Sequence, residues 1–315
     1  MIVALAGGVG GAKLADGLAA IIGGELTVIV NTADDFEHLG LPISPDLDTV
    51  MYTLAGIANP DTGWGVARET WSFLDQIVGL GGPAWFRLGD RDLATHVLRA
   101  VALRSGQTLT TITAELCRRL GIRARVLPMS DDVVRTIVHT PEGDLPFQEY
   151  FVARKCEVPV MGFEFAGIER ARPTAAVSDA LTAGDLEAIL FCPSNPFVSI
   201  DPILALPGLR SLIVDAGVPV VAVSSIIGGA AVKGPAAKMM RELGVQPSPA
   251  TVAAHYRGIV TGLIMDKADL SFKAAVEAMG MAVCVIDTLM RDAADRRRLA
   301  GQCLEFAGSL AFQRD

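Results

Sequence analysis

The sequence lacks the cysteine and histidine patterns that define zinc sites and disulfide frameworks. Its five cysteines are scattered without a C-x-x-C pair, and its four histidines form neither H-x-x-x-H nor H-E-x-x-H. Scattered cysteines suit buried thiols in a reducing compartment, so we expect a cytoplasmic protein. Neither a disulfide-stapled secreted domain nor a zinc centre is predicted.

The chain also lacks a basic excess and a membrane-spanning apolar run. It has 27 Lys and Arg against 35 Asp and Glu, and the net charge of −8 argues against binding nucleic acid or a membrane surface. One uncharged stretch, residues 216–232, is too short for a comfortable span and contains a proline and a glycine pair. An anionic substrate must therefore be met by glycine loops, a few basic side chains or a metal ion.

Glycine, by contrast, is concentrated at the start of the chain. Residues 1–13 read MIVALAGGVGGAK, an apolar run that leads through a glycine-rich turn into a helical pattern. Glycine lets the backbone approach a ligand closely, and a helix N-terminus offers free N–H groups to an anion. We interpret this turn as a phosphate-binding loop. The alternative is a tight turn whose glycines only allow close packing of the helix on the sheet.

The glycine turn matches neither of the familiar phosphate motifs. Lys13 stands where the third glycine of the dinucleotide fingerprint G-x-G-x-x-G should be, and Leu14 replaces the hydroxyl residue of the pattern G-x-x-x-x-G-K-[ST]. An NAD(P) oxidoreductase is disfavoured further because Asn31 and Thr32 end the second predicted strand, where a ribose-binding acidic residue should lie.

Short apolar runs alternate with helical patterns toward both ends of the chain. This alternation predicts a doubly wound, Rossmann-like and mostly parallel α/β sheet with helices on both faces. The predicted strands are residues 2–6, 26–31, 188–192, 218–224 and 282–286, and the helices between them include 12–22 and 199–215.

The regular alternation breaks in the middle of the sequence. Residues 46–105 carry helical periodicity and 109–121 predict another helix. Two later runs, 133–140 and 145–152, flank Pro-Glu-Gly-Asp and predict a β-hairpin. We therefore predict that residues 1–45 and 180–315 form the Rossmann-like core, and that 46–179 are an inserted, largely helical region with a hairpin.

Four aspartates fall within fifteen positions at the expected ligand-binding edge of the sheet. Asp34 and Asp35 directly follow the second predicted strand, and Asp46 and Asp48 stand at or just before a helix start. A helix N-cap is the alternative for either of the last two. Together with a phosphate loop, clustered carboxylates favour Mg²⁺, which takes one or two carboxylates plus substrate phosphates.

Three further segments carry polar residues beside apolar ones. Residues 89–96 contain alternating charges, either a surface network or an arginine held for a phosphate or carboxylate. Ser194 and Asn195 lie in a proline-flanked loop after the strand ending at Cys192. Residues 226–238 form a second glycine-rich passage with two lysines, either another phosphate loop or an ordinary turn.

Taken together and in this order, the segments resemble the 2-phospho-L-lactate transferase family of deazaflavin coenzyme F420 biosynthesis. The resemblance covers most of the chain, and the joint occurrence of the motifs is specific although each alone is weak. The matching segments are GGVGGAKL (7–14), NTADD (31–35), ISPDLDTVMYTLAG (43–56), GWG (63–65), LGDRDLATH (88–96), LPMSDD (127–132), FQEYFV (147–152), PSNPFVSIDPIL (193–204) and SSIIGGAAVKGPAAK (224–238).

The resemblance implies a phosphoryl transfer that depends on Mg²⁺. Such enzymes use a three-carbon acid activated as a GDP derivative and the hydroxy-deazaflavin Fo. The terminal ribityl hydroxyl of Fo attacks the phosphorus of the phospho-acid, and GMP leaves. The family accepts phospholactate, enolpyruvyl phosphate or phosphoglycerate on the donor, and it implies a Rossmann-like core with an extra domain and a homodimer.

The resemblance also implies roles for individual residues. The metal and the attacking hydroxyl are assigned to Asp34, Asp35, Asp46 and Asp48, with Asp34, Asp46 and Asp48 as metal ligands and one of the four as general base. The residues expected to face the diphosphate are Gly8, Gly10, Gly11 and Lys13, and Asn31, Ser194 and Asn195 are expected at the bound nucleotide. Arg91, as a catalytic residue, and Asp92 are expected near the acid or Fo. A regulator on the same fold that binds a nucleotide diphosphate without transferring anything is the competing hypothesis.

Overall fold

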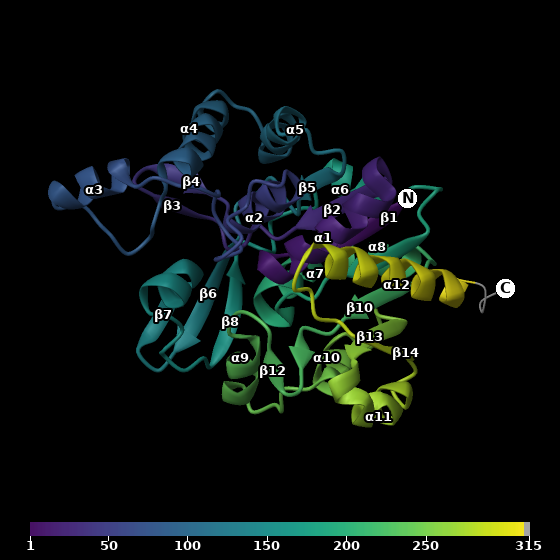
Figure 1. The fold of residues 1–315 in the computed structure, drawn as a ribbon. Coiled ribbons are helices and arrows are strands. Elements are labelled where there is room, and N and C mark those ends of the chain that lie inside the picture. The colour runs from purple at the N-terminus through teal and green to yellow at the C-terminus, as the bar shows by residue number, and fades with distance from the viewer. Residues whose placement is uncertain (312–315) are drawn as a thin grey trace.

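The computed structural model describes residues 1–311 and is built around one seven-stranded parallel sheet (Figure 1). Every strand pairs with its neighbours in the parallel sense. The strands, in their order across the sheet, are β14 (Ala282–Ile286), β13 (Gly262–Asp266), β10 (Val220–Val223), β9 (Ala188–Phe191), β1 (Ile2–Ala6), β2 (Leu26–Val30) and β5 (Arg125–Pro128).

The strands form where short apolar runs are buried on both faces, as parallel sheets require. All five residues of β1 and all five of β2 are buried. Val3 and Leu5 join one core layer, while Ala4 joins the other. All five predicted strands are found, and those at 2–6 and 282–286 have the predicted ends; β5 and β13 were not predicted.

Helices cover both faces of the sheet, which confirms the predicted doubly wound α/β fold. One face carries α1 (Gly8–Ile22), α2 (Pro45–Leu54), α5 (Leu109–Arg119) and α12 (Ala293–Ala311), and Figure 1 shows α12 (yellow) alongside α1 (purple). The other face carries α6 (Ala175–Leu181), α7 (Asp201–Leu204), α8 (Leu209–Asp215), α10 (Pro249–His255) and α11 (Lys273–Glu277).

The helix predicted over residues 199–215 is instead three short pieces. A π-turn, η3 (Pro196–Ile200), leads into α7, and α8 begins after Gly208, whose φ of +83° is a left-handed conformation that glycine adopts readily. Among residues 1–311 no single helix has the length and apolar composition of a membrane span. The η3–α7 piece and α8 pass that test only as a pair bent by 83°.

The segment between β2 and β9 builds smaller structures around this sheet. A hairpin of β3 (Phe36–His38) and β4 (Leu41–Ile43) precedes α2, and α3 (Ser72–Gly79) and α4 (Asp90–Arg104) project from the body (Figure 1). The predicted second hairpin is present as β6 (Arg135–Thr140) and β7 (Gly143–Pro146), with β8 (Gly162–Ala166) added as a third strand. Residues 149–153, predicted as strand, form the π-turn η2 (Glu149–Ala153).

The remaining elements of residues 1–311 are one short 3₁₀ turn before β2 and four elements that follow β10 in the sequence. They are η1 (Gly23–Glu25), the hairpin β11 (Ile226–Ile227) and β12 (Ala230–Ala231), α9 (Ala236–Glu242) and η4 (Lys267–Phe272). The division into a core and an insertion at residues 46–179 stays a prediction, although β5 from within that range forms one edge of the main sheet.

The strand order places a topological switch point between β1 and β9. From β1 the chain moves outward through β2 to β5, then returns to β9 on the other side of β1 and continues outward through β10 to β14. The loops after β1 and β9 therefore leave the sheet in opposite directions and open a crevice at the carboxyl ends of the strands, where ligands bind in such folds.

Candidate active site

The glycine turn lies at this switch point and is held by two side chains from distant segments. The Gly7 backbone N–H donates to Ser194 Oγ at 3.1 Å, and that hydroxyl donates to the Gly7 carbonyl at 2.8 Å. The Gly8 N–H donates to Asp46 Oδ1 at 2.8 Å. α1 has no side-chain cap at Gly7 and no acidic residue in its own first turn, and the Asp46 carboxylate lies at its positive end, which favours an anion.

The glycines of the turn also allow close packing. A Cβ on Gly10 would lie 2.4 Å from the Pro193 carbonyl oxygen, and one on Gly11 would lie 2.6 Å from Ser194 Oγ. Gly8 differs, because its φ of +62° is left-handed and its Cβ would have only Asp46 Oδ1 nearby, at 3.9 Å. Packing therefore explains Gly10 and Gly11, whereas Gly8 is required by its backbone conformation.

Asp34 and Asp46 form the centre of a buried acidic cluster after β2. Asn31 Nδ2 donates to Asp46 Oδ2 at 3.1 Å and to the Val198 carbonyl, so Asp46 is tied to both the strand end and η3. Asp34 is only 5% exposed, and its Oδ1 has no hydrogen-bond partner. Burial and then the neighbouring Asp46 charge raise the pKa of Asp34 well above its usual range, and burial raises the pKa of Asp46 to about 6.

Asp35 is the second carboxylate with an unused oxygen. Its Oδ2 accepts from Ser44 Oγ at 2.7 Å, while its Oδ1 is buried and has no partner. Burial raises the pKa of Asp35 to about 8. With this pKa the carboxyl is mostly protonated at neutral pH in the ligand-free protein, and it could act as a base toward a substrate hydroxyl only in its ionised form, which a nearby cation favours.

The open oxygens of this cluster fit a hard divalent cation. Within residues 1–311 no three His, Cys, Asp or Glu side chains are arranged as a complete metal site. Mg²⁺ does not need one, because it binds through one or two carboxylates, substrate phosphates and water. The unpartnered Asp34 Oδ1 and the repulsion between Asp34 and Asp46 are both relieved by a cation, so the metal prediction rests on this pair.

Asp48 is differently placed, because it faces a buried arginine. Arg99 Nη1 donates to Asp48 Oδ2 at 3.1 Å, and Arg99 Nη2 contacts Asp48 Oδ1 more closely. The sequence reasoning missed Arg99. Its only signal was a lone guanidinium in the mainly apolar run HVLRAVAL of residues 96–103.

Lys13 faces other cations close to the glycine turn. Its Nζ donates to the Met290 carbonyl at 2.9 Å, and its pKa is lowered by burial and by the charges of Arg296 and Lys233. Lys233 comes from the second glycine-rich passage and donates to the Thr62 carbonyl. The two glycine-rich passages thus bring their lysines near each other, and a polyanion bound between them would relieve that repulsion.

The other predicted residues have structural partners. Arg91 is exposed and donates from Nη1 to the Ala67 carbonyl, and Asp92 Oδ1 accepts from Tyr52 Oη at 2.6 Å. Asn195 Oδ1 accepts from the Phe197 N–H and caps η3. Arg91 and Asp92 are therefore not drawn into the acidic cluster, and their expected contacts with the acid or Fo stay predictions.

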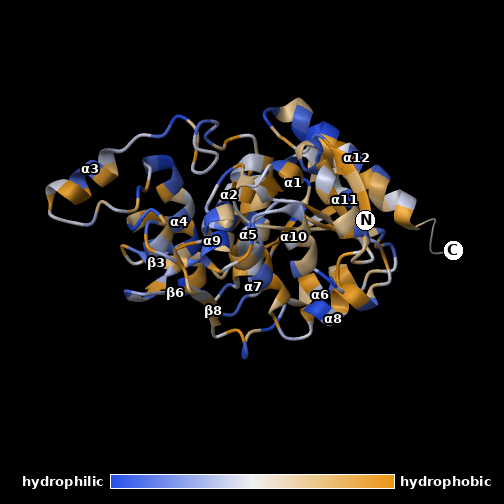
Figure 2. Cartoon of the chain, turned by 90° about the horizontal axis from the view of Figure 1, so that it is seen from below, coloured by the Kyte–Doolittle hydropathy of each residue, from blue (hydrophilic) through white to orange (hydrophobic). Residues whose placement is uncertain are grey.

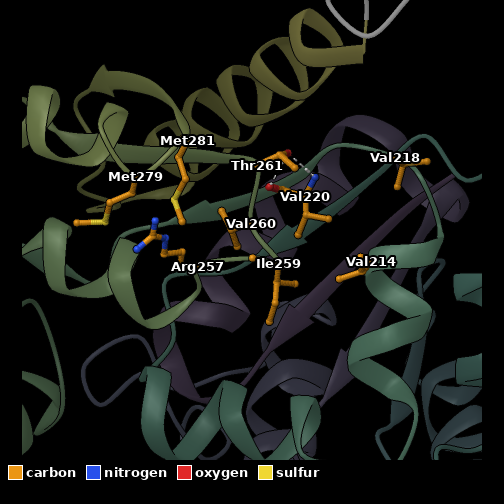
Figure 3. Close-up of a pocket in the computed structure, with 11 residues that line it drawn as sticks. Val214, Val218, Val220, Arg257, Ile259, Val260, Thr261, Met279 and Met281 are labelled. Atoms are coloured by element: carbon orange, nitrogen blue, oxygen red, sulfur yellow. Dashed lines mark hydrogen bonds between the residues drawn. The ribbon is translucent and has the colours of Figure 1, made fainter.

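Two cavities flank the sheet at opposite ends. The larger, about 420 Å³, lies at the amino ends of β10 and β13, and Figure 3 shows Arg257 beside Met279 and Met281 in its lining. None of the predicted site residues lines it. The smaller, about 270 Å³, is lined by Asp266, Asp287 and the β11–β12 hairpin, at the carboxyl end of the sheet that carries the glycine turn.

Comparison with known sequences identifies the family to which the chain belongs. Residues 2–297 match the family model described as 2-phospho-L-lactate transferase CofD. The chain belongs to this transferase family. The family resemblance drawn from the motifs is thereby confirmed, and so is the prediction that the chain is an enzyme.

Named relatives span the length of this family member. A Streptomyces griseus protein named phosphoenolpyruvate transferase is 43% identical over 97% of this chain and 98% of its own. A Methanosarcina mazei protein named 2-phospho-L-lactate transferase is 39% identical over 95% of this chain and 98% of its own. A Bacillus halodurans crystal structure of a UPF0052 member covers 96% of this chain and 98% of its own, with 16% identity and a TM-score of 0.61, which supports the fold alone.

Because Asp35 is buried in the acidic cluster, we expect the ligand-free transferase to lose stability as the pH rises. Asp35 keeps its proton in the folded protein up to a pKa of about 8, whereas the unfolded chain releases it near 3.8. Its contribution is fully present below pH 3.8 and is lost as the pH rises through 8. In EDTA the melting temperature should fall across this window, and in Asp35→Asn it should fall less. If the melting temperature fell equally with pH in the wild type and in Asp35→Asn, this result would contradict the raised pKa of Asp35.

Proposed function

We propose that the chain transfers a phospho-three-carbon acid from its GDP-activated form to Fo, releasing GMP, in coenzyme F420 biosynthesis. The single observation that carries the proposal is the buried Asp34–Asp46 cluster facing the glycine turn at the switch point of a transferase-family fold. We propose enolpyruvyl phosphate as the acid, because relatives named phosphoenolpyruvate transferase reach 40–44% identity, against 39% for those named 2-phospho-L-lactate transferase.

The diphosphate of the donor is proposed to lie between the two glycine-rich passages. The N-terminus of α1 supplies backbone N–H groups, and Lys13 and Lys233 supply positive charge from either side. Asp34 and Asp46 would hold Mg²⁺, which neutralises phosphate charge when it is bound. A protein of net charge −8 needs such local neutralisation to accept a polyanion.

The planar ring of Fo is proposed to pack against an aromatic cluster that begins one residue after Asp35. Phe36, His38, Trp85 and Phe86 form this cluster, with the Phe36 and Phe86 ring centroids 4.9 Å apart. Trp85 is 37% exposed, so part of the cluster remains open to a ligand. Aromatic faces bind flat conjugated rings by offset stacking and edge contacts.

Asp35 is proposed as the general base. Its open Oδ1 accepts the proton of the ribityl hydroxyl as that oxygen forms its bond to the phosphorus of the phospho-acid. The bond from this phosphorus to GMP breaks, and GMP leaves with the electron pair. Catalysis in such a transfer comes mainly from positioning and charge stabilisation, which suits a site without a nucleophilic cysteine or serine.

Mass spectrometry of the products tests this function and the donor together. Fo is incubated with Mg²⁺ and each of the three GDP-linked acids, and the expected result is GMP with the enolpyruvyl phosphodiester of Fo as the main product. Omitting Fo or Mg²⁺ should abolish GMP release. Binding of the GDP-linked acid without any product would favour the non-catalytic regulator.

The chain is proposed to work in the cytoplasm as a homodimer that buries the outer face of α3 and α4. Figure 2 shows hydrophobic residues on α3 at the outer end of the molecule, away from the C-terminus. On α4, Leu98 and Val101 are each 57% exposed, and Leu80 just after α3 is 86% exposed. Exposed apolar patches of this kind mark interaction surfaces.

Charged substitutions on this face should dissociate the dimer. We expect Leu98→Lys with Val101→Lys to elute as a monomer in light-scattering chromatography while keeping its circular dichroism. Val133→Lys is the matched control, because Val133 is 69% exposed outside this face and its change should leave the dimer intact. A wild-type monomer would rule out the interface.

A further inference from the structure

Arg99 lies fully buried beneath the first turn of α2, at 0% exposure. Its guanidinium contacts both oxygens of Asp48, which is 51 residues earlier in the chain. Its Nη1 also lies 3.2 Å from His96 Nδ1. A guanidinium stays charged in proteins, so its burial is stable only with a carboxylate partner of this geometry.

A second contact joins the same two helices one turn away. Asp92 Oδ1 accepts from Tyr52 Oη at 2.6 Å and lies 3.2 Å from His96 Nε2. Asp48 and Tyr52 are four residues apart on α2, and Asp92, His96 and Arg99 follow one another along one side of α4. These five side chains form a polar seam that sets the position of α2 against α4.

The polar seam lies next to Asp46, the residue on which the proposed site depends. Asp46 lies two residues before Asp48 in the first turn of α2, and its oxygens accept from the Gly8 N–H and from Asn31 Nδ2. In residues 1–311, Arg99 is the one fully buried arginine or lysine, and its charge acts on Asp48, Asp35 and Asp92. Its charge is matched by Asp48, which leaves Asp34, Asp35 and Asp46 without a protein cation in contact.

We infer that Arg99 is a positioning residue: through Asp48 it holds the first turn of α2 so that the Asp46 carboxylate meets the Gly8 N–H, and Asp48 is its anchor rather than a metal ligand. This inference rests on the proposed function for the role of Asp46. It departs from the ligand set expected from the family resemblance, in which Asp48 binds the metal. The observation that separates the two is that both Asp48 oxygens are engaged by one guanidinium.

The test compares Asp48→Asn, Arg99→Met and Arg99→Lys with the double variant Asp48→Asn/Arg99→Met in the full-length protein. Each single neutral substitution leaves one uncompensated buried charge, and the double variant leaves none. We expect the double variant to melt above both single variants. The affinity for Mn²⁺, measured by electron paramagnetic resonance as a probe of the cation site, should fall by similar factors, within threefold of one another, in Asp48→Asn, Arg99→Met and the double variant, because all three release the same turn of α2.

A metal-ligand role for Asp48 gives the opposite result. Asp48→Asn and the double variant would then lose Mn²⁺ affinity at least tenfold while Arg99→Met, which keeps Asp48, stays within threefold of wild type, and this outcome would overturn the anchor assignment. Arg99→Lys serves as the conservative variant, because a lysine keeps the charge but cannot contact both Asp48 oxygens through a planar fork.

Hydrogen exchange at the Gly8 amide distinguishes positioning from general stabilisation. In Arg99→Lys the Gly8 amide should lose protection at least tenfold while the amide of Gly308 in α12 is unchanged. Equal protection of the Gly8 amide in the wild type and in Arg99→Lys would refute the positioning role of Arg99. This readout needs no substrate, so it remains valid if the wild type forms no product with Fo and the proposed function fails.

Discussion

The Asp34→Asn variant should lose turnover by about a hundredfold to a thousandfold and still fold at least as stably as the wild type. Asparagine has the same shape as aspartate but no charge, so it removes the repulsion between Asp34 and Asp46. It also removes one of the two carboxylates proposed to hold Mg²⁺ beside the diphosphate. The kcat of GMP release with Fo at saturating Mg²⁺, and the urea midpoint in EDTA, measure the two effects separately.

The same substitution at Asp179 is the control for Asp34→Asn. Asp179 is exposed on α6 and far along the chain from the acidic cluster, so Asp179→Asn should change neither kcat nor the urea midpoint. Turnover of Asp34→Asn within threefold of wild type would show that Asp34 does not serve the reaction. A large fall in its urea midpoint would show that Asp34 is a structural residue.

The opposite effects expected of Asp34→Asn on rate and on stability follow from the proposed role of the acidic cluster in binding a ligand. A buried carboxylate with an unused oxygen destabilises the free protein, and a fold retains such a group when a bound ligand compensates it. Asp35 shows the same pattern with its open Oδ1. By contrast, Asp48 is fully compensated by Arg99, and its removal should destabilise the protein.

Much of the sheet could be predicted because buried parallel strands are continuous apolar runs. β1 and β14 were predicted at both ends for this reason. β5 was missed because Arg125 and Pro128 bound a run of only two apolar residues, and β13 because Gly262 and Asp266 leave a core of three. Short strands are specified by their neighbours in the sheet more than by their own pattern.

The positions of the candidate-site residues could be predicted where these residues follow strands in the sequence. Asn31, Asp34 and Ser194 each come within a few residues of a strand end, so parallel-sheet geometry alone places them at one edge. Arg99 could not be predicted in the same way. It lies within a helix, and its partner Asp48 is separated from it by α3 and by a loop whose course the local sequence does not specify.

Substituting alanine for Gly10 should be the most damaging small change in the glycine turn. The new Cβ would lie 2.4 Å from the Pro193 carbonyl oxygen, which is backbone and cannot rotate away as a side chain could. Either α1 or the loop after β9 must move, and we expect the free energy of unfolding to fall by about 1–3 kcal/mol. Since the same loop carries Ser194, which holds Gly7, turnover should fall as well.

Gly308→Ala separates this clash from the effect of alanine on a helix. Gly308 lies within α12, and a Cβ there meets no atom within 4 Å, so alanine should stabilise the protein by roughly 0.5–1 kcal/mol through helix propensity alone. Urea denaturation gives the change in the free energy of unfolding for each variant. The cost of the contact with Pro193 is the difference between these two changes, and it exceeds the loss seen in Gly10→Ala alone because alanine also favours the helix. A Gly10→Ala protein as stable as Gly308→Ala would mean that the turn and the loop after β9 are not in close contact. The glycine at position 10 would then be explained by approach of a ligand, because no steric requirement of the fold would remain.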